Sequence, residues 1–322
     1  MMRLLVLSLL FFVTLSATEN LAERYRHDGL GAVERALDNQ LATPAHWKEV
    51  FKTHDVVYGF FDRPTDLLIC SKAEKKLELY RANGRFELRH TTPIILGAMP
   101  GDKVKEGDLR TPVGVYKIVD RLENPGPEYG PLALVTDYPN RYDRILGKNG
   151  HGIWLHGYPF DCDDKNATKG CIAVKNDTLV ALDAKMDYRH ALLIIADAPL
   201  PKVDRDTLAN LLAFLFDWRR DWKYNRFDAY LGHYAPDLVF KEKYDFDDFK
   251  KYKRAVFAKN EGLRKRLGFT DLKVLPYPNS HSKKLWYVSF FETYRCGDYR
   301  FDGTKELLVE ELSPGRFAIV VE

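Results

Sequence analysis

The sequence has 322 residues, of which 45% are hydrophobic and 30% are charged, with 49 basic and 46 acidic side chains. The formal net charge of only +3 excludes a strongly basic binding surface, so we expect no nucleic-acid partner. A chain of this length exceeds what one hydrophobic core usually fills, and it therefore predicts two domains with a smaller appendage.

The first residues have the pattern of a secretory signal peptide. Arg3 precedes an apolar run over residues 4–16, and small and polar residues follow it. The run is too short to span a bilayer comfortably, and no later segment is long and apolar enough. We therefore expect residues 1–17 to be cleaved and the mature protein to be exported without a membrane span.

Residues 18–55 are predicted to be helical, because Val33, Leu37 and Leu41 recur at helical spacing. Pro44 is expected to end the first helix. A short helical arm has no core of its own, so it must pack on the next domain or on a partner chain. A homodimer formed through this arm is one such arrangement.

Short strands are predicted from residue 56 onward, because apolar and β-branched residues alternate between turn signals rich in glycine and proline. The segments are DLLICSK, KLELYRA, RFELRHTTPIILG, VGVYKIV, LALVT, GIWLHG and ALLIIAD. They predict a mostly-β sandwich or barrel-like domain over residues 56–198.

A second domain is predicted over residues 199–322, after a linker at Pro199–Pro201. Leu208, Leu212, Leu215 and Trp222 belong to an apolar stripe at helical spacing, and more helix is expected over residues 225–260. Four strands are then predicted in LKVLPY, LWYVSFFETY, ELLVEEL and RFAIVVE. Helices followed by antiparallel strands indicate an α+β domain.

Residues 151–171 carry the chemistry, since HGIWLHGYPFDCDDKNATKGC holds two histidines, two cysteines and three aspartates. A metal site is disfavoured because His151 and His156 are an odd number of residues apart, which places them on opposite faces of a strand. The segment also lacks a calcium-loop pattern, and the chain has no CxxC pair for structural zinc. We therefore expect neither a metal nor another cofactor.

Two interpretations of the cysteines remain. A disulfide between Cys162 and Cys171 could close a short polar loop in an exported protein. Alternatively, the Thr-Lys-Gly turn presents Cys171 as a nucleophile, with backbone amides facing a developing oxyanion. His156 would then accept its proton, whereas His151 is expected in an exposed loop. The residue chemistry favours the cysteine–histidine pair.

These motifs resemble the L,D-transpeptidase catalytic (YkuD) domain. The resemblance rests on WLHG, on the fifteen-residue step from His156 to Cys171, and on TKGCIAV. It also includes GDKVKEGDLRTPVGVYKI and PEYGPLALVTDYPNRYDR, and it covers roughly residues 56–198. The second of these segments is similar to family members that act in Gram-negative periplasms.

The resemblance implies a role for each matching residue. Cys171 is the nucleophile, His156 is the base, and the carbonyl of Gly157 orients the imidazole. Gly170 forms the tight turn and, with the Cys171 amide, donates to the oxyanion. Thr168 matches the Ser/Thr of the motif.

The chain departs from many family members at two positions, Lys169 instead of histidine and Ala173 instead of arginine, which bear on the acceptor side. Further candidates for contact with the substrate are Trp154 and Tyr129 as cleft walls and Arg110 as a partner for a substrate carboxylate. Cys70, Cys162 and Cys296 are expected to be buried or incidental thiols.

Residues 199–322 resemble an NTF2-like fold, which implies an unknown ligand at most. The order of arm, YkuD domain and NTF2-like domain resembles the peptidoglycan L,D-carboxypeptidases that set helical cell shape in Helicobacter and Campylobacter relatives. It implies a periplasmic enzyme that trims stem tetrapeptides to tripeptides. The alternatives are a transpeptidase forming 3–3 crosslinks or attaching proteins to meso-diaminopimelate, and a non-catalytic wall-binding module.

Overall fold

The computed structural model describes residues 20–160, 166–240 and 244–322. The predicted signal peptide and Cys162 lie outside these ranges. Among the described residues, no helix has the length and apolar character needed to cross a membrane.

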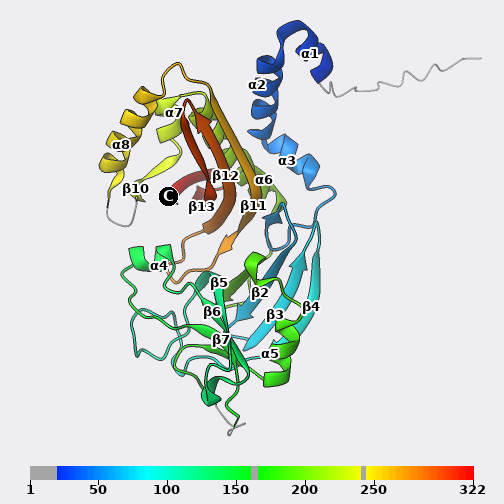
Figure 1. The fold of residues 1–322 in the computed structure, drawn as a ribbon, viewed down its shortest axis with the longest axis vertical. Helices are drawn as coiled ribbons and strands as arrows, with labels where there is room; N and C mark the ends of the chain where they lie inside the picture. The colour runs from blue at the N-terminus through cyan, green and yellow to red at the C-terminus, as the bar shows by residue number, and fades with distance from the viewer. Residues whose placement is uncertain (1–19, 161–165, 241–243) are drawn as a thin grey trace, which may run out of the picture.

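Three helices form the N-terminal arm: α1 (Leu21–Asp28), α2 (Leu30–Leu41) and α3 (Pro44–Val50). Pro44 occupies the first turn of α3, where its missing N–H costs nothing, so the predicted break between helices is confirmed. Trp47 of α3 and the following Phe51 are buried against the C-terminal domain, whereas α1 buries no residue. The arm extends along one side of that domain, away from the N-terminal sheet (Figure 1).

The predicted catalytic segment forms an eight-stranded sheet in the order β4-β3-β2-β9-β5-β6-β7-β8. The strands are β2 (Thr65–Ser71), β3 (Lys76–Ala82), β4 (Phe86–Pro93), β5 (Gly114–Glu123), β6 (Leu132–Thr136), β7 (Trp154–Gly157), β8 (Ile172–Val174) and β9 (Ala191–Ala196). The helical segments between them are η1 (Pro127–Tyr129), α4 (Arg141–Ile145), α5 (Asn176–Asp183) and η2 (Tyr188–His190). β5 pairs with β9 through its first residues and with β6 through its later ones, which joins the two halves of the sheet.

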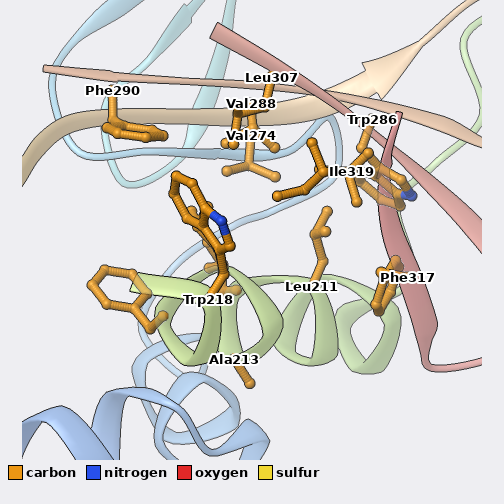
Figure 2. Packing of buried hydrophobic residues seen from close by; sticks show 14 of the residues in the cluster. Leu211, Ala213, Trp218, Val274, Trp286, Val288, Phe290, Leu307, Phe317 and Ile319 are labelled. Carbon is orange, nitrogen blue, oxygen red and sulfur yellow. The ribbon is translucent and has the colours of Figure 1, made fainter. Parts of the chain in front are cut away.

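The C-terminal domain is a six-stranded sheet in the order β1-β11-β12-β13-β14-β10, packed against helices. Its strands are β1 (Phe60–Phe61), β10 (Tyr234–Val239), β11 (Lys265–Tyr277), β12 (Leu285–Cys296), β13 (Tyr299–Ser313) and β14 (Arg316–Val321). Its helices are α6 (Arg205–Lys223), α7 (Phe227–Leu231) and α8 (Phe246–Lys259). Figure 2 shows Leu211 and Trp218 projecting from α6 toward Val274, Val288 and Phe290 of the sheet.

Two features differ from the sequence prediction. The helix expected over residues 225–260 is interrupted by β10, which pairs in parallel with β14. Pairing with the distant strand β14 makes this segment a strand, so its local sequence pattern does not predict its conformation. In addition, Phe60–Phe61 pair with β11, so this part of the predicted catalytic segment joins the C-terminal sheet.

The two sheets share an apolar interface. All of β2 and β9 is buried, and their residues alternate between two cores. Leu68 and Leu193 lie in the core of the N-terminal domain, whereas Leu67 and Leu192 lie in a cluster that also contains Tyr287 of β12. The two sheets and their helices confirm the predicted fold, which consists of a mostly-β YkuD-like domain, an α+β domain and a helical arm.

Candidate active site

The strand β7 supplies the histidine of the site. Successive residues of a strand point to opposite faces, so Leu155 enters the core while Trp154 and His156 share the other face. Tyr129, at the end of η1, packs against both of these rings, with centroid distances of 4.9 Å to Trp154 and 5.1 Å to His156. Of the two aromatic residues predicted as cleft walls, Tyr129 therefore lies against the histidine, and Trp154 contacts Tyr129 from the same strand face as His156.

The imidazole of His156 is buried, and its Nδ1 lies 2.7 Å from the carbonyl oxygen of Gly157. A carbonyl can only accept a hydrogen bond, so this contact assigns the proton to Nδ1 and makes Nε2 the proton acceptor. Gly157 has no room for a side chain, because a Cβ there would lie 2.1 Å from Oδ1 of Asn176. The absence of a side chain at Gly157 therefore allows α5 to approach the strand that carries the histidine.

Cys171 is a free thiol directly before β8, which pairs in parallel with β7 and aligns Ala173 with His156. The thiol donates to the carbonyl of Gly152 with an Sγ–O distance of 3.4 Å. Burial raises the pKa of the Cys171 thiol above its usual value, whereas a hydrogen bond from the Trp154 backbone and the charge of Lys103 lower it. At neutral pH the resting sulfur is therefore protonated and needs a base.

The turn before the cysteine is held by Thr168. Its hydroxyl donates to the carbonyl of Cys171 at 2.7 Å and accepts from the Gly170 amide at 3.1 Å. Gly170 has a φ of +138°, and a Cβ there would lie 2.7 Å from the Arg110 carbonyl oxygen, so only glycine fits. Because the Gly170 amide already donates to this hydroxyl, the Cys171 amide is the better candidate for a hydrogen bond to the oxyanion.

The other residues singled out in the sequence differ in their burial and contacts. Lys169 is exposed, and Arg110 is half-buried beside the glycine turn. His151 is exposed, with Nε2 3.4 Å from the Glu106 carboxylate. Ala173 is buried and exchanges backbone hydrogen bonds with Ile95.

Two residues near the site were not predicted. Lys103 is buried, pairs with Asp108 at 2.8 Å, and places a positive charge near the Cys171 sulfur. Asn176 has a buried Oδ1 with no hydrogen-bond partner in the described part of the chain. Lys103 lies in a glycine-rich segment, but no local signal in the sequence predicts that this segment lies near a cysteine almost seventy residues later.

One group of side chains in the described residues could bring three metal-ligand atoms together, namely Asp217, Asp221 and His233 of the C-terminal domain. Nε2 of His233 lies 3.0 Å from Asp221, and Arg220 and Arg226 pair with the two carboxylates. These arginines already compensate the acidic charge, so the group fits an internal ion-pair network better than a metal centre.

Two family models match the chain. The L,D-transpeptidase catalytic domain (YkuD) matches residues 65–190, and the Cds6 C-terminal NTF2-like domain matches residues 210–322. The fold and the cysteine–histidine site thus define a protein with a YkuD catalytic domain followed by an NTF2-like domain.

Comparison with solved structures extends this match over most of the chain. The helical cell shape determining protein Pgp2 from Campylobacter jejuni is 32% identical, with a TM-score of 0.80 over 87% of this chain and 98% of that chain. The chain belongs to the family that includes Pgp2. Bd1075 of Bdellovibrio bacteriovorus, at 22% identity and a TM-score of 0.66 over 83% of this chain and 97% of that chain, shares the fold.

Among curated relatives, YafK of Escherichia coli K12 carries the name of an L,D-transpeptidase. It is 32% identical over 108 residues, which cover 33% of this chain. The chain spans 40% of the length of this relative.

Proposed function

We propose that the protein is a periplasmic peptidoglycan L,D-carboxypeptidase that trims stem tetrapeptides to tripeptides and thereby affects cell shape. One observation carries the proposal: a free thiol, Cys171, directly precedes the strand that pairs with the strand of His156, whose Nδ1 lies 2.7 Å from a carbonyl oxygen. The cell-shape role is supported by the family shared with Pgp2, which is named for it. Export is supported by the signal-peptide pattern.

The proposed reaction begins when Cys171 attacks the carbonyl at the L-centre of meso-diaminopimelate. His156 Nε2 takes the thiol proton as the carbon–sulfur bond forms and returns it to the amine of D-alanine as the amide bond breaks. A water molecule then attacks the thioester and gives a proton to His156 Nε2. The thiolate that is released as the carbon–sulfur bond breaks takes that proton from the histidine. The cycle consumes one water and yields a tripeptide and D-alanine.

The negative charge of the tetrahedral intermediate needs donors beside the sulfur. We assign this role to the Cys171 amide, with Gly170 holding the turn that presents it. Thr168 keeps that turn rigid through its two hydrogen bonds. Trp154 and Tyr129 are proposed to contact the substrate, because they line the same face as His156.

Hydrolysis is favoured over transpeptidation by the resemblance of the whole chain to the carboxypeptidase branch. Two positions on the acceptor side agree with it. Lys169 replaces a histidine that many relatives carry, and the short side chain of Ala173, buried against Ile95, replaces an arginine. A transpeptidase remains the second proposal, because the first half-reaction is common to both activities. A wall-binding module is disfavoured because both Cys171 and His156 are present.

An intact-mass measurement tests the first half-reaction. The purified protein is mixed with disaccharide-tetrapeptide and quenched in acid within seconds. We expect a species heavier by the disaccharide-tripeptide acyl group, and peptide mapping should place it on Cys171. An adduct on another residue, or D-alanine release by the Cys171→Ala variant, would contradict the proposal.

A further inference from the structure

A buried lysine lies against the segment that contacts the Cys171 sulfur. The side chain of Lys103 is buried, and it packs on the backbone of Gly150, where a Cβ would lie only 2.7 Å from the lysine Cε. Two residues farther along the chain, the carbonyl of Gly152 accepts the hydrogen bond from the Cys171 thiol. Lys103 is thus held on the segment that contacts the nucleophile, although no step of the proposed reaction uses it.

The ammonium group of Lys103 is fixed by acceptors of its own loop. It donates to Asp108 at 2.8 Å and to the carbonyl oxygen of Lys105 at 3.3 Å. The same carboxylate accepts from the backbone amides of Val104, Lys105 and Arg110. Burial opposes the ionisation of Asp108, but the bond from Lys103 and these amides outweigh it and hold the carboxyl pKa well below its usual range. Asp108 is therefore an ionised partner for the lysine, and three amide dipoles offset its own negative charge.

The loop that carries Lys103 is anchored from both domains. The preceding residue, Asp102, accepts from the Val113 amide at 2.8 Å and from the buried Lys148 at 2.7 Å. Ser280, in the connection between β11 and β12 of the C-terminal domain, donates to the same carboxylate at 3.2 Å. A charge that is fixed in place before the reaction can stabilise a developing negative charge without the cost of reorganisation.

The groups around the sulfur have different effects on its charge. Burial raises the pKa of the Cys171 thiol, and Lys103 supplies an opposing positive charge. His156 accepts the thiol proton through Nε2 and carries no charge before it does so. Tyr129 is a neutral phenol, because burial and then the charge of Cys171 raise its pKa. The other ionisable side chains of the neighbouring segments are exposed or half-buried, namely His151, Lys169 and Arg110.

We propose that Lys103 is a positioning residue whose buried ammonium stabilises the anionic sulfur of Cys171 in both halves of the reaction. In the first half, the thiol proton passes to His156 and the sulfur becomes negative before the carbon–sulfur bond forms. In the second half, the same sulfur leaves as a thiolate. Lys103 keeps its protons throughout, and no bond to it forms or breaks. Its role in the reaction rests on the proposed function, whereas its effect on the thiol does not.

Alkylation of the resting enzyme by iodoacetamide tests the effect on the thiol. Lys103→Gln removes the charge but keeps a donor for Asp108. Its alkylation rate at pH 8 should fall about threefold or more, because loss of the cation raises the thiol pKa and leaves less thiolate. Lys105→Gln is the matched control, since it removes an exposed lysine of the same loop and should leave the rate unchanged. Equal rates for Lys103→Gln and the unmodified protein would overturn the proposal.

A titration of the unmodified lysine separates an effect of charge from an effect of structure. Coupling between two ionisable groups is mutual, so ionisation of the Cys171 thiol must also act on the Lys103 ammonium. In protein with ¹³C-labelled lysine, the Cε resonance of Lys103 should show an inflection at the pH at which alkylation places the thiol pKa. Cys171→Ser should abolish this inflection. If the inflection is the same in both proteins, the proposal fails, and this result holds even if Lys103→Gln does not fold.

Turnover connects the effect to the reaction. Lys103→Gln should lower kcat for release of D-alanine from disaccharide-tetrapeptide at least fivefold at pH 7, while Lys105→Gln should stay within twofold of the unmodified protein. Slower alkylation with an unchanged kcat would contradict a role in the reaction.

The two proposals can fail separately. If the unmodified protein releases D-alanine but its alkylation does not respond to Lys103→Gln, the proposed function stands and the assignment of Lys103 fails. If both thiol measurements give the expected result but no D-alanine is released, the proposed function fails and the effect of Lys103 on Cys171 stands.

Discussion

At the scale of single residues, the site combines a protonated thiol with a histidine held in one tautomer. Burial raises the pKa of Cys171, so the sulfur is not a resting thiolate. The contact between His156 and the Gly157 carbonyl directs the other ring nitrogen to proton transfer. Removing either partner should therefore stop the same step.

We expect Cys171→Ala to abolish turnover and Cys171→Ser to leave almost none, because a serine hydroxyl forms its anion much less readily. His156→Ala should lower kcat by about 10²–10⁴-fold, the usual contribution of a general base. His151→Ala, an exposed histidine, is the control and should change kcat less than threefold. Steady-state release of D-alanine measures all four, and an inactive His151→Ala variant would mean that the base has been assigned to the wrong histidine.

The raised thiol pKa predicts how the free enzyme reacts with iodoacetamide. Only the thiolate reacts, so the alkylation rate of Cys171 should rise about tenfold per pH unit and, because its pKa is raised, continue to rise above about pH 8.5, the usual thiol pKa. Mass spectrometry of the Cys171 peptide over time gives the rate. A plateau below pH 7 would show a resting thiolate and contradict this account.

At the scale of elements, a buried carboxylate contributes to holding the arm on the C-terminal domain, beside the apolar contacts of Trp47 and Phe51. Asp38 of α2 accepts from Lys223 at 2.6 Å and from Tyr224 at 2.7 Å. Burial alone would raise the pKa of Asp38, but these bonds and the charge of Arg219 outweigh it and lower the pKa. A lowered carboxyl pKa means that this stabilisation is present at neutral pH and is lost as the pH falls through the folded pKa.

Asp38→Ala should destabilise the protein by about 3 kcal/mol at pH 7, because it leaves the buried Lys223 and Arg219 without a shared partner. Asp206→Ala is the control, since it removes an exposed contact with Lys48 between α3 and α6 and should cost about 0.5 kcal/mol or less. Thermal unfolding compares the two variants. Equal melting temperatures would show that the buried network does not anchor the arm.

The elements show what the sequence could and could not predict. The catalytic strands were predictable because their short apolar runs between turn residues are local signals, and Cys171 and His156 because both lie in short motifs. The strand β10 was not, because its pairing with β14 depends on residues about eighty positions away. Lys103 and Asn176 were missed for a similar reason, since only the folded chain brings them to the site.

At the scale of the whole molecule, the two sheets meet through an apolar cluster with a charged edge. Lys117 of β5 pairs with Glu306 of β13 at 2.8 Å, and Tyr287 donates to the same carboxylate. Burial, aided by the charge of Glu306 and opposed by Lys117, raises the pKa of Asp137 to about 6. The folded state therefore holds this proton more tightly than the unfolded state does.

This shift predicts a pH-dependent stability. The contribution of Asp137 is fully present below about pH 4 and is lost as the pH rises through 6, so the ionised carboxylate costs about 3 kcal/mol at neutral pH. Asp137→Asn should raise the melting temperature at pH 7.5 and give no gain at pH 4. A gain of equal size at both values would exclude ionisation as its cause.

The central claim is that Cys171 forms an acyl-enzyme that water resolves, and product analysis tests it most directly. Purified protein is incubated with disaccharide-tetrapeptide, and the muropeptides are separated and weighed by mass spectrometry, with Cys171→Ala as the control. The account predicts disaccharide-tripeptide and D-alanine in equal amounts, and neither product from the variant. Accumulation of 3–3 crosslinked dimers without matching tripeptide would contradict it.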